Sequence, residues 1–99
     1  MSSNESQQTA QILSVRKVLR NPYFVSRYPQ IHYYMLYISL RISDQTYCSE
    51  FETPVLDEIE DLTSATGKSV EVVLKGKSIA IRTPKGRKLK THLAERKQC

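Results

Sequence analysis

Apolar and polar side chains alternate most clearly between residues 33 and 42. The even positions of this stretch carry large apolar side chains, whereas the odd positions end in Ser39 and Arg41. Because neighbouring side chains of a strand point to opposite faces, the stretch predicts a β-strand with one face in the core. The members of that face are Tyr34, Leu36, Ile38, Leu40 and Ile42.

A second strand is expected over residues 45–52, after a tight turn at Ser43 and Asp44, because both residues favour turn conformations. The two strands should pair as an antiparallel hairpin. The alternation continues the inner face and places charged side chains outside, which assigns Tyr47 and Phe51 to the inside and Glu50 and Glu52 to the outside.

A helix is expected to begin after Thr53 and Pro54. Thr53 is a favourable N-cap residue, and proline fits the first helical position because its missing N–H would be unpaired there anyway. Gly67 can end the helix in a left-handed conformation. The apolar stripe that should face the core consists of Val55, Leu56, Ile59 and Leu62. The acids expected on the solvated outer face are Asp57, Glu58, Glu60 and Asp61.

The part of the chain before this hairpin divides into a tail, a strand and a loop. Residues 1–9 are polar and are expected to form a disordered tail outside the fold. Residues 10–20 fit a strand, with a helix as the competing interpretation. Asn21 and Pro22 end this element, and an aromatic loop follows over residues 22–30.

A second hairpin is expected after Gly67. Apolar and polar residues alternate over 70–75 and again over 79–82, on either side of a turn centred on Gly76.

Residues 87–93 also alternate, which predicts one more strand. Leu89 and Leu93 fit one face of a short helix as well, and of the two interpretations we favour the strand. Residues 95–99 are expected to fray, as chain ends generally do.

Residues 10–94 are therefore expected to form a single β-rich domain of the α+β class. The elements follow the order β-β-β-α-β-β, with a further strand at the C-terminal end, and the short connections favour antiparallel pairing. The predicted architecture is a small antiparallel β-barrel or roll with one helix. This order resembles that of the oligonucleotide-binding (OB) barrels, which place a helix between their third and fourth strands. The resemblance is confined to element order, because the glycine-rich aromatic signatures of cold-shock and RRM proteins are missing.

Charge is segregated along the chain, whose formal net charge is +5. Residues 64–99 contain ten Lys or Arg against two acids, whereas residues 50–63 contain six acids and no base. A small basic protein with a cationic C-terminal third attracts a polyanion or an acidic partner at long range.

Two groups of residues are candidates for nucleic-acid binding. Basic side chains of the C-terminal third could contact phosphates if they share a face, and these candidates are Lys75, Lys77, Arg82, Lys85, Arg87, Lys88 and Lys90. Side chains of the aromatic loop could stack on unpaired bases or contact phosphate, and these candidates are Tyr23, Phe24, Arg27 and Tyr28. Tyr33 and Tyr37, on the outer face of the best strand, could extend that platform. The competing interpretations are a solvated basic surface and a loop that closes one end of a barrel.

The sequence contains no catalytic, metal-binding or nucleotide-binding motif. The acidic cluster has no neighbouring histidine and no glycine-centred calcium loop, and neither His32 nor His92 has metal-ligand spacing. With only three glycines, the chain has neither a phosphate-cradling loop nor a G-x-S-x-G motif. We therefore expect a protein that is not an enzyme and that uses no metal and no cofactor.

The cysteines and the hydropathy bear on the compartment. Cys48 is expected to be a small buried side chain and Cys99 an exposed thiol, because a bridge would have to tie the chain end back onto the sheet. No apolar run reaches the roughly 18 residues that span a bilayer, and the N-terminus lacks the basic and apolar blocks of a signal peptide. These features predict a soluble, cytoplasmic protein with no membrane partner and no small-molecule substrate.

The function that these features favour is a small binding module that engages single-stranded nucleic acid through a basic hairpin face and the aromatic loop. The alternative is a protein–protein interaction module or a homo-oligomer that uses a sheet edge and the acidic helix. Oligonucleotide affinity that falls steeply with salt would indicate the first, and a concentration-dependent mass in sedimentation would indicate the second.

Overall fold

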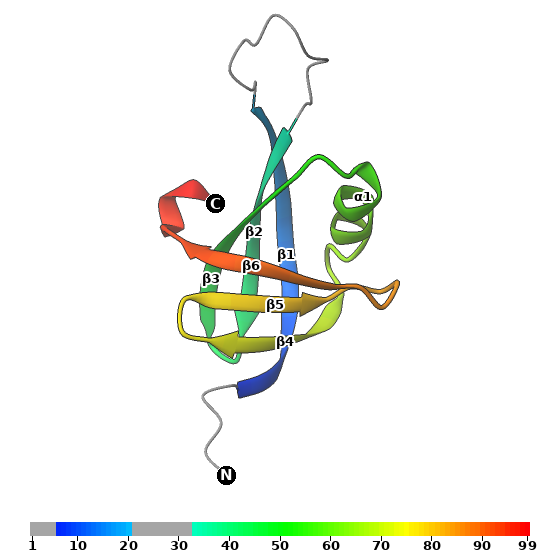
Figure 1. The fold of residues 1–99 in the computed structure, drawn as a ribbon. Coiled ribbons are helices and arrows are strands. Elements are labelled where there is room, and N and C mark those ends of the chain that lie inside the picture. Colours follow the sequence, from blue (N-terminus) through cyan, green and yellow to red (C-terminus); the bar gives the residue numbers. More distant parts are fainter. Residues whose placement is uncertain (1–5, 21–32) are drawn as a thin grey trace, which may run out of the picture.

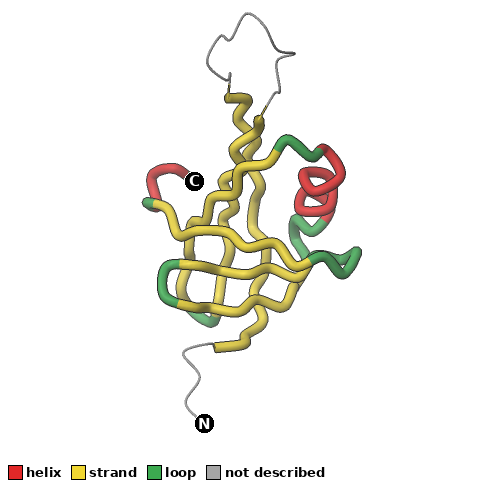
Figure 2. The backbone as a smooth tube through the Cα atoms, viewed as in Figure 1, coloured by secondary structure: helices red, strands yellow, loops and turns green. Residues whose placement is uncertain are grey.

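The computed structural model describes residues 6–20 and 33–99, which form six strands, one α-helix and one 3-10 turn (Figures 1 and 2). The hydrogen-bonded strand order is β1-β2-β3-β6-β5-β4, and β4 returns to β1, so the sheet closes into a barrel whose neighbouring strands are all antiparallel. This confirms the expected α+β class and the antiparallel barrel. The elements are β1 (Ser6–Arg20), β2 (Tyr33–Ile42), β3 (Gln45–Thr53), α1 (Leu56–Ser64), β4 (Ser69–Lys75), β5 (Ser78–Arg82), β6 (Lys88–Ala94) and η1 (Arg96–Gln98).

The barrel consists of two groups of three strands that cross at a steep angle in Figure 1, with β4, β5 and β6 in front of β1, β2 and β3. The strand predicted over residues 87–93 is confirmed as β6, which lies between β3 and β5. The helix α1 lies in the connection from β3 to β4, as its place in the sequence required.

The core is built on the inner face of β2, as the alternation predicted. Leu36, Ile38 and Leu40 are completely buried and Ile42 nearly so, whereas Arg41 is exposed. Tyr34 is half-buried at the end of this face and packs against the core. The core continues around the barrel through Ile12, Val72, Ile79, Ile81 and Leu89.

The strand β1 begins at Ser6, so the boundary expected at Ala10 is wrong. Residues 6–11 pair with β4, and this ladder closes the barrel. Gln7 and Thr9 are exposed, whereas Gln8 is half-buried and Ala10 is buried, so the side chains of this segment alternate between solvent and the barrel. The sequence suggests a tail because residues 6–9 are all polar, so the alternation of apolar and polar side chains that indicates a strand is missing. Residues 1–5 lie outside the described part of the chain.

Beyond its pairing with β4, β1 continues beside β2 (Figure 1), and we call this part of the two strands the β1–β2 ribbon. The other edge of β2 pairs with β3 as far as Tyr34 and Thr53. Pairing of β1 with β4 ends at Gln11, but pairing of β1 with β2 continues to Arg20 and Tyr33. The register of β1 against β2 shifts between Ile12 and Ser14, which leaves Leu13 as an extra residue with 40% of its surface exposed. The ribbon leads into residues 21–32.

The helix begins two residues later than expected, at Leu56. The hydroxyl group of Thr53 nevertheless stabilises the segment that leads into the helix. It accepts a hydrogen bond from the backbone N–H of Val55 at 3.0 Å and donates one to Glu58 Oε1 at 2.5 Å. Val55 occupies the N-cap position without a side-chain cap of its own.

The predicted faces of the helix need two corrections. Val55 and Leu56 were expected in the apolar stripe but are 44% and 59% exposed, and only Ile59 and Leu62 of that stripe are buried. Asp61 was expected on the solvated face but is completely buried. The helix is short, and the turn that faces the barrel is centred on residues 59–62, so positions at its first turn project past the core.

The helix ends before Gly67. Its C-cap is Ala65, and Gly67, with φ of +81°, adopts the expected left-handed conformation in the connection to β4. The N–H of Gly67 donates to the carbonyl of Ile12 at 2.7 Å, and the N–H of Ile12 donates to the carbonyl of Lys68 at 3.0 Å. These bonds tie the end of the helix to β1.

The C-terminus is bound to the barrel, which contradicts both the expected fraying and the expected free thiol. Cys48 on β3 and Cys99 form a disulfide, with their Cα atoms 5.8 Å apart. Cys48 is buried as predicted, at 2% exposure. In the structure β6 runs beside β3 with Ala94 opposite Cys48, so the chain needs only the short turn η1 to bring Cys99 back to Cys48. The sequence disfavours this bridge because it does not show the pairing of β3 with β6.

Candidate functional site

Four of the seven predicted basic residues lie together on the outer face of β4, β5 and β6. Every second side chain of these strands points away from the core. The strand register arranges the outward side chains in three rows that cross from β4 to β6: Glu71, Arg82 and Lys88; Val73, Ala80 and Lys90; and Lys75, Ser78 and His92.

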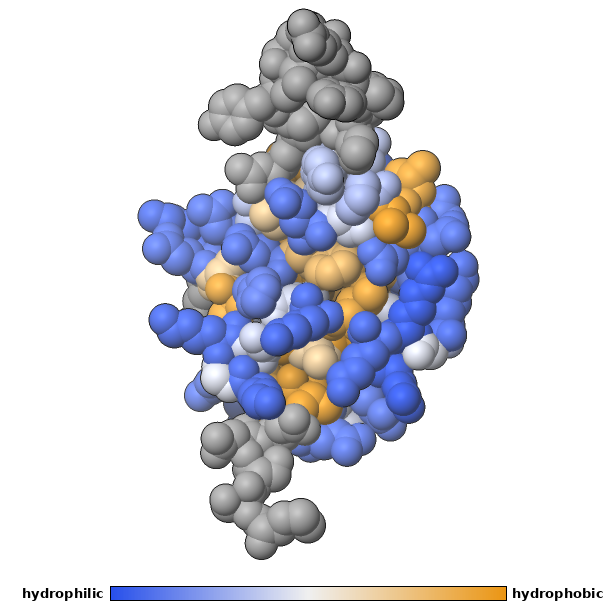
Figure 3. Space-filling view, viewed as in Figure 1, coloured by the Kyte–Doolittle hydropathy of each residue, from blue (hydrophilic) through white to orange (hydrophobic). Residues whose placement is uncertain are grey.

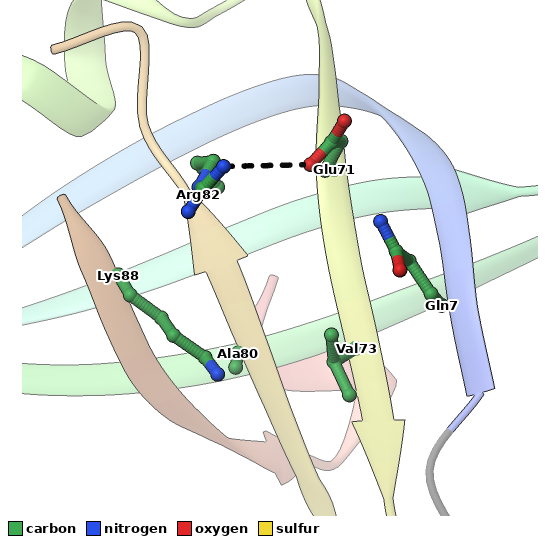
Figure 4. A pocket seen from close by; sticks show the side chains of 6 residues that line it. All are labelled: Gln7, Glu71, Val73, Ala80, Arg82 and Lys88. Atoms are coloured by element: carbon green, nitrogen blue, oxygen red, sulfur yellow. Dashed lines mark ion pairs between the residues drawn. The ribbon is translucent and has the colours of Figure 1, made fainter. Parts of the chain in front are cut away.

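Two shallow hollows lie over the small side chains at the centre of these rows. One, of about 190 Å³, is bordered by Gln7, Glu71, Val73, Ala80, Arg82 and Lys88 (Figure 4). The other, of about 260 Å³, is bordered by Val73, Lys75, Ser78, Ala80, Lys88 and Lys90. Small side chains form the floor of both hollows, and basic side chains border them, together with Gln7 and Glu71 at the first. We call Lys75, Arg82, Lys88 and Lys90, with the floor of Val73, Ser78 and Ala80, the cationic face.

Of the basic groups on the cationic face, Arg82, Lys88 and Lys90 are at most weakly neutralised. Arg82 Nη1 lies 4.0 Å from Glu71 Oε2, and both side chains are more than half exposed, so this ion pair contributes little. In the described part of the chain no ion pair involves Lys88 or Lys90, and both residues are exposed. Figure 3, which looks onto β4–β6, shows hydrophilic side chains around small apolar areas. The face therefore presents positive charge around a shallow floor of small side chains.

The other three predicted basic residues lie elsewhere. Lys77 is exposed in the turn between β4 and β5, and Lys85 is exposed in the turn between β5 and β6, at the opposite end of β5. Arg87 is directed towards α1, because its Nη2 lies 3.9 Å from Asp57 Oδ2. Its backbone N–H donates to the hydroxyl oxygen of Thr83 at 3.0 Å, which closes the turn. The structure thus does not bring these three residues onto the cationic face.

The aromatic candidates are divided by the limits of the described chain. Tyr23, Phe24, Arg27 and Tyr28 lie outside the described residues. Tyr33 and Tyr37 are on β2 and half-buried, and Tyr37 points outward, as the alternation predicted. Their role in binding stays a prediction.

Sequence reasoning missed two pairs of basic and aromatic side chains on the β1–β2 ribbon. The guanidinium carbon of Arg16 lies 4.6 Å from the ring centroid of Tyr37, and the ammonium of Lys17 lies 5.1 Å from that of Tyr34. Both distances are within the range of cation–π contacts. The pairing of β1 with β2 creates these contacts, and no local pattern in residues 10–20 indicates them.

The chain matches no family model, no curated protein and no solved structure. Within the described residues, no helix is long and apolar enough to cross a membrane. In the same residues, no three His, Cys, Asp or Glu side chains are grouped so that they could hold a metal ion.

Proposed function

We propose that the protein is a non-enzymatic module that binds single-stranded nucleic acid on the cationic face. The observation that carries the proposal is the convergence of Lys75, Arg82, Lys88 and Lys90 around a floor of small side chains. Basic groups scattered over a surface serve solubility. Basic groups that surround a shallow floor can contact several phosphates of one polyanion at the same time.

The spacing of the basic side chains suits a chain of phosphates. Lys88 and Lys90 are two residues apart on β6, so their Cα atoms are about 6.7 Å apart. Arg82 lies opposite Lys88 on the neighbouring strand, which adds a planar fork of donors suited to phosphate oxygens. Small floor residues such as Ala80 let the sugar–phosphate backbone approach closely. The element order of the barrel resembles that of the five-stranded OB proteins, and this resemblance is a supporting analogy.

The proposal is tested by fluorescence anisotropy with a labelled oligothymidylate over a series of salt concentrations. The wild type should bind at low salt, with affinity that falls as salt rises, because each neutralised phosphate releases counterions. The double variant Lys88→Glu/Lys90→Glu should lose at least about tenfold in affinity and show a shallower salt dependence.

The matched control is Lys68→Glu/Lys85→Glu, which changes the net charge by the same amount with two exposed lysines that lie outside the cationic face. Its affinity should fall by less than about threefold at moderate salt, where long-range fields are screened. Absence of wild-type binding at low salt would refute the proposed function. Equal losses in the two double variants would refute its location on this face.

A further inference from the structure

One row of outward side chains continues from the cationic face around the barrel. Ser78 lies opposite His92 on β6, and His92 lies opposite Glu50 on β3. Glu50 lies opposite Tyr37 on β2, and Tyr37 lies opposite Arg16 on β1. Since adjacent strands are about 4.8 Å apart, Tyr37 lies about 10 Å from His92 across the strands. A strand held on the cationic face needs only a few further nucleotides to reach Tyr37.

The pair at the end of this row is in cation–π contact. Arg16 is exposed, and its guanidinium lies over the half-buried ring of Tyr37 at 4.6 Å. Because Arg16 is exposed, its guanidinium can also contact a ligand on the side away from the ring. Arginine planes and aromatic rings are the groups on which proteins stack unpaired bases.

The C-terminal segment holds Arg16 in this position. Arg16 Nη2 donates a hydrogen bond to the backbone carbonyl of Gln98. The neighbouring residue, Cys99, is bonded to Cys48 on β3, and the N–H of Gln98 donates to the carbonyl of Glu95 at 2.9 Å. The disulfide therefore positions the carbonyl that orients the guanidinium. A side chain that is fixed before binding loses less entropy when a ligand stacks on it.

The charge along the row decides which part of a nucleotide can reach Tyr37. Glu50 lies between His92 and Tyr37 and would repel a phosphate at that point, whereas it does not repel a neutral base. Phosphates are therefore better placed over Lys88 and Lys90, with a base directed towards the ribbon.

We propose that Arg16 and Tyr37 form a base-stacking site for the single strand that the cationic face holds by its phosphates, and that the disulfide-bonded C-terminus orients this site. The inference rests on the proposed function. It adds a contribution from the bases that the cationic face alone does not supply.

The test compares two ligands of equal length, an oligothymidylate and a strand of abasic deoxyribose phosphates. The wild type should bind oligothymidylate more tightly than the abasic strand. Tyr37→Leu should lower the affinity for oligothymidylate at least about fivefold and the affinity for the abasic strand less than about twofold. Tyr37→Leu leaves the net charge of the protein unchanged. Tyr34→Leu is the matched control, because Tyr34 contacts Lys17 and lies on the other face of the ribbon. Its affinities should stay within about twofold of the wild type.

A second measurement does not depend on the stability of the leucine variant. The chain contains no tryptophan, so Tyr37→Trp introduces a single indole whose fluorescence reports stacking. Oligothymidylate should quench this fluorescence, and the abasic strand should not. In Tyr34→Trp, oligothymidylate should cause a clearly smaller change.

Cys99→Ser should lower the affinity for oligothymidylate by about two- to fivefold and leave the affinity for the abasic strand within about twofold of the wild type. An unchanged oligothymidylate affinity would refute the role of the disulfide.

The outcomes separate the two proposals. If the wild type binds neither ligand at low salt, the proposed function fails. If it binds both ligands equally, with Tyr37→Leu unchanged and no quenching in Tyr37→Trp, the cationic face stands and the base-stacking site is refuted.

Discussion

At the scale of single residues, the fold depends on which face of β2 a side chain occupies. Leu40 is completely buried, whereas its neighbour Arg41 is exposed. Leu40→Asp should lower the free energy of unfolding by several kcal/mol, on the order of 4, because it places an unpaired charge in the core. Arg41→Asp should change it by no more than about 0.5 kcal/mol. Urea denaturation of both variants measures the difference, and comparable losses would contradict the assigned faces.

Asp61 is a polar residue buried without a partner for its side chain. Its side chain is completely buried, and among residues 6–20 and 33–99 neither carboxylate oxygen has a hydrogen-bond partner. A buried group that lacks partners costs free energy, and a charged one costs more than a neutral one. Asp61→Asn should therefore raise the free energy of unfolding, by on the order of 1 kcal/mol.

The control for Asp61 is Glu60→Gln, which makes the same change of charge at an exposed position of α1. It should leave stability within about 0.5 kcal/mol of the wild type. Thermal unfolding of the two variants provides the comparison. A loss of stability in Asp61→Asn would indicate that the carboxylate is stabilised where it lies.

At the scale of elements, the sequence predicts strands wherever one face is apolar and the turn has its own signal. The hairpin of β2 and β3 follows from alternation on both sides of Ser43, which has φ of +56° in the turn. Gly76, with φ of +58°, gives the same signal between β4 and β5. These sequence signals are local, so they predict the hairpins even when the other neighbours of each strand are unknown.

The elements that were misjudged depend on contacts distant in sequence. The strand over residues 6–9 exists because β4 pairs with it, and its own side chains are polar. The start of α1 is shifted because Thr53 ends β3, where it pairs with Tyr34. A capping preference is worth about 1 kcal/mol, which is too little to override the pairing of a strand.

The candidate site was predictable to the same extent. Alternation places Lys88 and Lys90 on one face of a strand, and the turn at Gly76 indicates that β4 and β5 are neighbours. The sequence does not contain the register, so it could not show that Arg82 lies opposite Lys88, or that Arg87 is directed towards Asp57. The contact of Arg16 with Tyr37 depends on the pairing of β1 with β2 across residues 21–32.

At the scale of the whole molecule, the barrel depends on two closures that join distant parts of the chain. One is the pairing of β1 with β4, and the other is the pairing of β3 with β6. The second is short, since it extends only from Cys48 to Glu50 on β3. The disulfide lies at the end of this short ladder, so it reinforces the closure that has fewer paired residues.

Loss of the disulfide should therefore lower the stability of the whole barrel. The bridge joins residues 51 apart in sequence, and a link of that length restricts the unfolded chain substantially. Cys99→Ser should lower the free energy of unfolding by about 2–4 kcal/mol in guanidinium denaturation. The wild type with its disulfide reduced should show a similar loss, because both lack the same constraint. A change below about 0.5 kcal/mol in both would mean that the ladder of β3 and β6 closes the barrel without the bridge.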